Sequence, residues 1–88
     1  MSRREHDETY TNDSGRDATG LKLDLRQGCT PKKSANGRYG GAFVNSHGSD
    51  GASSHEFSDG TVKAGESITI TFATTANNFR TRRVTWVP

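Results

Sequence analysis

The stretch FSDGTVKAGESITITF, residues 57–72, decides the class of fold that this sequence predicts. In its second half Ile68, Ile70 and Phe72 alternate with serine and threonine. A period of two places these apolar side chains on one face of a β-strand, and that face needs a covering layer. The stretch therefore predicts a β-strand in a small layered domain.

Other segments carry the same kind of signal. The dipeptide Asp59-Gly60 is typical of a two-residue turn, so we expect a hairpin that joins residues 55–58 to residues 61–63. Three leucines alternate with charged residues over residues 20–26, which predicts a strand with one buried face. A weaker strand is expected at residues 39–45, where two glycines interrupt the pattern, and residues 46–54 are expected to form a loop.

The last expected strand, residues 79–87, does not keep its alternation in phase. Val84 and Trp86 share a face with Arg80 and Arg82, whereas Phe79 falls on the other face. Either a β-bulge near Arg82-Arg83 resets the phase, or the first half of the strand leaves the sheet. We favour the bulge.

Composition divides the chain into two parts. Only 28% of the 88 residues are hydrophobic and the mean hydropathy is −0.88, but the large apolar residues are concentrated beyond residue 20. We therefore expect a flexible N-terminal arm at residues 1–19 and a single β domain at residues 20–88. No segment has the 3.6-residue apolar period of a helix. The predicted fold is all-β, either a small antiparallel β-sandwich of immunoglobulin-like type or a small barrel.

The formal charge of +2 also differs between the two parts. Residues 1–19 contain three arginines against five acidic residues, or −2, and the remainder contains nine basic residues against five acidic ones, or +4. A mildly basic domain is compatible with an anionic partner but does not require one.

The chemistry-bearing residues do not form a recognisable set. Cys29 is the only cysteine, so no intrachain disulfide can form. His47 and His55 do not have a zinc-binding spacing, and neither could be assigned from the sequence as a base for Cys29. So small a core leaves little room for a pocket of about 300 to 1,000 Å³. We expect no catalytic, metal or cofactor residues, no small-molecule substrate and no enzymatic activity.

No apolar run is long enough for a membrane span, and no signal peptide is visible. As written, the chain is expected to begin in the cytoplasm. If it is an excised module, a surface or extracellular location is the alternative.

Residues 57–70, FSDGTVKAGESITI, carry a family resemblance. A phenylalanine, then Gly-Thr, then Ala-Gly-Glu before an alternating strand resembles immunoglobulin-like surface modules and lamin-tail-type domains. With Val-Thr-Trp at residues 84–86, the chain is also similar to the β-domain of archaeal pilin-type proteins. It lacks the tryptophan that precedes the hairpin in lamin-tail domains and the apolar N-terminal helix of pilins. The resemblance implies an extracellular or assembly-type binding module without an active site.

Two functions follow as hypotheses. The first is a non-enzymatic module that acts through its sheet surface in protein interaction or self-assembly, by adding an edge strand to a partner. The alternative is a single-stranded nucleic-acid-binding small barrel, because basic residues interleaved with aromatics can follow phosphates and stack on bases. The residues expected to bind nucleic acid are Arg80, Arg82, Arg83, Trp86, Tyr39, Lys32 and Lys33.

Overall fold

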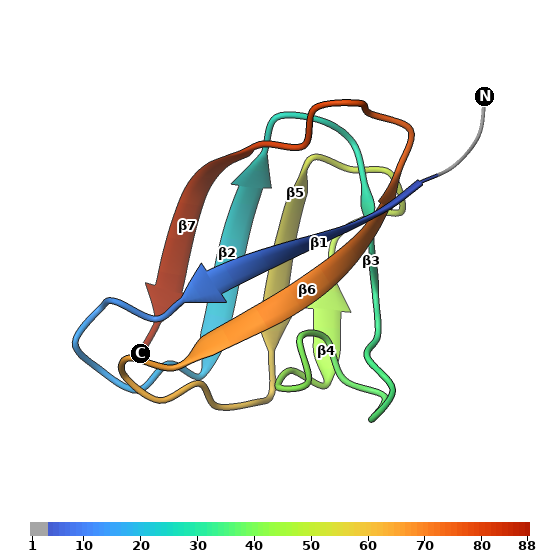
Figure 1. Cartoon of the computed structure of the whole chain (residues 1–88). Helices are drawn as coiled ribbons and strands as arrows, with labels where there is room; N and C mark the ends of the chain where they lie inside the picture. Colours follow the sequence, from blue (N-terminus) through green and yellow to red (C-terminus); the bar gives the residue numbers. More distant parts are fainter. Residues whose placement is uncertain (1–3) are drawn as a thin grey trace.

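A computed structural model describes residues 4–88 and shows two antiparallel sheets packed face to face (Figure 1). One sheet has three strands in the order β1-β6-β3, and the other has four in the order β4-β5-β2-β7. This confirms the predicted all-β sandwich, and the two sheets do not close into a barrel. The strands are β1 (Arg4–Thr11), β2 (Gly20–Leu25), β3 (Thr30–Lys32), β4 (Asn45–His47), β5 (Ser54–Ser58), β6 (Ser67–Thr74) and β7 (Thr81–Val87).

The two stretches with the clearest alternation are internal strands, one in each sheet. β6 lies between β1 and β3, and β2 lies between β5 and β7. Their apolar residues face each other across the sandwich and are buried, which confirms both predicted strands. The buried cluster consists of Tyr10, Leu21, Leu23, Leu25, Cys29, Phe43, Phe57, Val62, Ile68, Ile70 and Phe72.

The prediction of a flexible arm is wrong for residues 4–19. β1 pairs with β6 along its whole length, from Arg4 opposite Thr74 to Thr11 opposite Ser67. After the strand, the buried Asn12 side chain donates to two backbone carbonyls, one of them that of Val62. Charged residues on this edge strand gave it the composition of a disordered segment. The first three residues of the expected arm lie outside the described residues.

Residues 39–45 do not form the expected strand. Gly40 and Gly41 have φ angles of 61° and 70°, which a strand cannot accommodate, and the chain makes tight turns closed by a single bridge between Tyr39 and Phe43. Of this range only Asn45 belongs to a strand, β4, which continues into the segment that was expected to be a loop. The short β3 contains Pro31, which lies opposite Phe72 of β6.

The predicted hairpin at Asp59-Gly60 is also wrong. Of the pair only Asp59 has a positive φ, at 61°, and the chain then crosses from the four-stranded sheet to the three-stranded one. Val62 pairs with Ala18 rather than with β5. A Cβ at Gly60 would collide with the carbonyl oxygen of Ala42, so glycine is required here for close backbone approach.

The bulge predicted near Arg82-Arg83 is present. Asp24 of β2 lies opposite Arg83, whereas Leu25 lies opposite Thr81, so Arg82 has no partner in β2. The extra residue resets the alternation and brings Val84 and Trp86 onto the face of β7 that they share with the buried leucines of β2.

The order of the strands limits the likeness to immunoglobulin domains to their general architecture. In the constant-type immunoglobulin domain the first two strands share a sheet. Here β1 and β2 belong to different sheets, and β1 pairs with β6. Residues 4–88 contain no helix that is long and apolar enough to cross a membrane.

Candidate functional site

Both sheets end, on the same side of the sandwich, in a long edge strand (Figure 1). Within residues 4–88, β1 has only β6 as a backbone neighbour and β7 has only β2. The opposite edges, β3 and β4, have three residues each, against eight in β1 and seven in β7. A free edge presents unpaired N–H and C=O groups, so this side offers the longest runs of available backbone.

Side chains, rather than backbone pairing, connect these two strands. The Tyr10 hydroxyl is 2.8 Å from Oγ1 of Thr81, and the Trp86 indole N–H donates to the carbonyl oxygen of Thr11 at 3.1 Å. The contacts advance together along both strands, so β1 and β7 run in the same direction, as Figure 1 also shows. We call the region between the two strands, bounded by Tyr10, Thr11, Thr81, Val84 and Trp86, the β1/β7 seam.

Val84 is the apolar residue that the seam leaves open. It lies opposite Leu23, which is only 1% exposed, yet Val84 itself remains 40% exposed. Val84 therefore lies outside the buried cluster and leaves an apolar surface at the seam. Trp86 is partly buried against the core.

The two sides of the seam carry opposite charge. β1 contains three acidic residues against one arginine, or −2 with His6 neutral, and β7 contains two arginines and no acidic residue, or +2. Asp7 and Arg83 lie on the outer faces of their respective sheets, since Asp7 accepts from Thr71 and Arg83 is opposite Asp24. An acidic edge and a basic edge thus lie side by side on one side of the domain.

The Tyr10 hydroxyl remains protonated over the physiological range. Burial raises its pKa to about 12, against the opposing effect of the hydrogen bond to Thr81, because the charged phenolate is poorly solvated there. The link between the sheets at this point is therefore a hydrogen bond between two neutral hydroxyl groups.

The structure divides the residues that the sequence grouped as a nucleic-acid site. Arg80, Arg82, Arg83 and Trp86 lie in or next to β7, and the indole N–H of Trp86 already has a protein acceptor. The rest belong to the opposite edge, near β3 and β4, where Lys32 is in β3 and the Lys33 ammonium lies 5.8 Å from the Tyr39 ring centroid. Tyr39 itself packs against Phe57.

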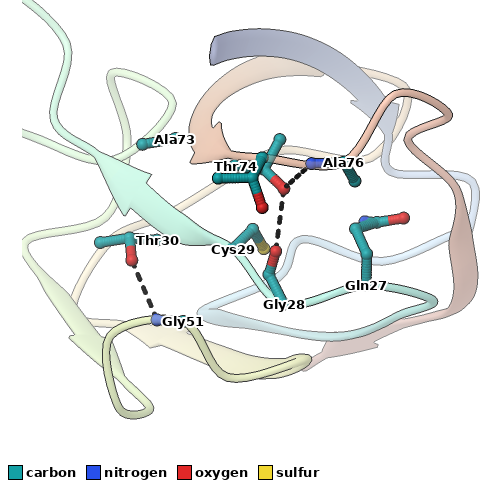
Figure 2. A pocket seen from close by; sticks show the side chains of 9 residues that line it. Gln27, Gly28, Cys29, Thr30, Gly51, Ala73, Thr74 and Ala76 are labelled. Atoms are coloured by element: carbon teal, nitrogen blue, oxygen red, sulfur yellow. Dashed lines mark hydrogen bonds between the residues drawn. The ribbon is translucent and has the colours of Figure 1, made fainter. Parts of the chain in front are cut away.

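Cys29 lies at a small hollow of about 320 Å³ between the two sheets (Figure 2). No histidine lines this hollow, and its polar groups bind one another: the Thr74 hydroxyl donates to Gly28 and accepts from Ala76. The thiol is buried, and burial raises its pKa to about 11, so the reactive thiolate is disfavoured.

The histidines that the sequence considered for metal binding have other surroundings. His55 is buried, and its Nε2 is 2.9 Å from the carbonyl oxygen of Cys29 and 2.8 Å from that of Ala52. His47 is exposed and its Nε2 is 3.0 Å from the Ser58 hydroxyl. Among residues 4–88 no three histidine, cysteine or acidic residues are grouped as metal ligands would be.

A shallow groove also crosses the outer face of the four-stranded sheet. Three of its charged groups are engaged within the sheet: Lys22 pairs with Glu56 at 3.5 Å, and Ser54 donates to Asp24 at 2.7 Å. Such exposed pairs contribute about 0 to 1 kcal/mol each, so the groove shows solvated sheet surface rather than a strained or activated cluster.

Comparisons of the chain with protein-family models, with curated proteins and with solved structures find no match. The β1/β7 seam is therefore the feature from which a function can be inferred. The acidic strand of the seam was not identified from the sequence, because the residues of β1 were assigned to a flexible arm. The available signal was the Thr-Tyr-Thr run at residues 9–11, which has strand propensity and a single apolar residue directed inward.

Proposed function

We propose that this domain is a non-enzymatic protein-binding module that accepts an extended strand of another polypeptide at the free edge of β7. The observation that carries the proposal is a seven-residue edge strand with a free side and a half-exposed valine on its core-facing surface. Addition of a strand to a sheet edge is a recurrent mode of peptide recognition, in which backbone hydrogen bonds supply affinity and side chains supply selectivity.

The surroundings of β7 define the peptide that fits. A strand added at the usual spacing of about 4.8 Å would cover Val84, and burial of its remaining exposed surface contributes about 1 kcal/mol. Arg82 and Arg83 are exposed on this strand, so they favour a partner segment that carries acidic side chains.

Single-stranded nucleic acid is the second candidate, because Arg80, Arg82 and Arg83 gather at one edge. The observations that weigh against it are the engaged indole of Trp86 and the position of Lys32, Lys33 and Tyr39 at the other edge. A protein strand uses the free backbone of β7, which phosphates do not need.

The test uses a displayed library of random extended peptides selected on the full chain. Peptides should be enriched in acidic and β-branched residues, and Val84→Lys should abolish their binding because a charge is placed against the partner strand. Val44→Lys is the matched control, since Val44 is 43% exposed but precedes β4. A library without binders, or binders that Val84→Lys leaves unaffected, would overturn the proposal. Salt-dependent binding of a single-stranded oligonucleotide without peptide binding would favour the second candidate instead.

A further inference from the structure

The geometry points to a specific partner strand for β7: β1 of a second copy of this chain. We propose a closed two-fold dimer in which β7 of each copy pairs in parallel with β1 of the other. This inference rests on the proposed function, because it uses the same free edge of β7. It also assigns a role to β1, the second long edge on the same side of the sandwich.

Charge is the first argument for this pairing. The acidic residues of β1, a strand with a net charge of −2, would lie beside the partner's β7, which carries Arg82 and Arg83 and has a net charge of +2. Within one chain these groups belong to different sheets, and the structure shows no ion pair between β1 and β7 among the described residues. Opposite charges across an interface both steer association and fix the register.

Symmetry selects the pairing. Two copies that meet at this side can be related by a two-fold axis perpendicular to the two sheets or by one parallel to the strands. The first brings β1 against β1 and β7 against β7, which places acidic residues beside acidic residues and arginines beside arginines. The second keeps the direction of the strands and exchanges the sheets, so that β1 of each copy meets β7 of the other. Since β1 and β7 run in the same direction, the resulting pairs are parallel.

The second arrangement also covers the open part of the core. Each three-stranded sheet would continue into the four-stranded sheet of the other copy, giving two sheets of seven strands. Val84 of both copies would then face one another between these sheets, beside Tyr10 and Trp86. Seven residues extend over about 23 Å, so the two strand pairs form a continuous contact along the seam.

The dimer closes rather than growing into a filament. Both edges lie on one side of the domain, so a copy that places β7 on a partner necessarily places β1 on the same partner. An interface of this type is isologous, in which residue i contacts residue j and j contacts i, and it leaves no free binding edge on that side.

Sedimentation of the full chain over a concentration series tests the inference. We expect a monomer–dimer equilibrium that shifts toward monomer as salt is raised, because the contacts across the interface are attractive. Reversing the charge of β7 with Arg82→Glu/Arg83→Glu should raise the dimer dissociation constant at least tenfold. Reversing the charge of β1 with Glu5→Arg/Asp7→Arg should have the same effect. The chain that carries all four changes should recover it, since opposite charges again meet. Val84→Lys should also dissociate the dimer, and Val44→Lys should not.

Three results would overturn the proposed dimer. These are a chain that stays monomeric at every concentration, a dimer that salt strengthens, or a charge reversal on one strand that leaves dimerisation unchanged. The last two would indicate pairing of like strands. The failure of this inference is distinguishable from that of the proposed function, because peptide binding that depends on Val84 in a monomeric chain would leave the edge of β7 as a binding site for another protein. Circular dichroism of each variant shows whether the β-sandwich is retained.

Discussion

Replacement of Tyr10 by phenylalanine should destabilise the domain at neutral pH and stabilise it, relative to wild type, at strongly alkaline pH. At neutral pH, Tyr10→Phe removes the 2.8 Å hydrogen bond to Thr81 and changes little else in a side chain that is 5% exposed. The loss of one such bond lowers the free energy of unfolding by about 1 kcal/mol. For a domain of this size, whose total stability is about 5 to 10 kcal/mol, that change is easily measured.

Alkaline pH acts in the opposite direction. In the folded protein the pKa of Tyr10 is raised from 10.0 to about 12, so the folded state holds the proton more tightly than the unfolded state. The stability linked to this group is complete below pH 10 and is lost as the pH rises through 12. Two pKa units correspond to about 3 kcal/mol. Burial of Cys29 adds a similar loss between its ordinary value of 9.0 and about 11.

Urea denaturation at a series of pH values, followed by Trp86 fluorescence and by circular dichroism, measures both effects. The wild-type protein should be more stable than Tyr10→Phe at pH 7, and the difference should vanish and then change sign as the pH approaches 12. Tyr39→Phe is the control, because Tyr39 is partly exposed and makes no link between the sheets at the seam. Parallel curves for wild type and Tyr10→Phe from pH 7 to 12 would refute the argument. The measurements are made at concentrations where the chain is monomeric, so that association does not contribute to the free energy of unfolding.

Two further changes test interior contacts in the same assay. His55→Leu should lower the free energy of unfolding by about 1 to 3 kcal/mol, because two backbone carbonyls lose their donor. His47→Leu, at an exposed position, should stay within about 0.5 kcal/mol of wild type. Equal effects of the two substitutions would contradict the assigned hydrogen bonds. Gly60→Ala should cost more than about 2 kcal/mol, since the added methyl group meets the carbonyl of Ala42, and an unchanged urea midpoint would show that the crossing segment is not tightly packed.

The parts of the fold that the sequence predicted are those where one physical requirement dominates. β2 and β6 are internal strands with one fully buried face, so Leu23 and Ile70 have to alternate with polar residues. The bulge at Arg82 was visible because the chain must restore that alternation before Val84. These signals are local, and no tertiary contact overrides them.

The failures have a different physical origin. β1 is an edge strand whose charges discourage uncontrolled pairing, and its composition is the same as that of a disordered segment. The hairpin predicted at Asp59-Gly60 is absent, because Gly60 packs against the carbonyl of Ala42, a contact that the local sequence does not indicate. The seam joins two strands about seventy residues apart, so its charge pattern emerges only when the sandwich is assembled.

The pairing of β1 with β6 has a consequence for how the chain is made. Translation proceeds from the amino end, so β1 is synthesised well before β6, in which Thr74 lies opposite Arg4. Until β6 emerges, β1 has no backbone partner, and its charged side chains keep it solvated. The three-stranded sheet can therefore form only after β6 has been synthesised, and a nascent chain stalled before residue 67 would lack the strand that pairs with both β1 and β3.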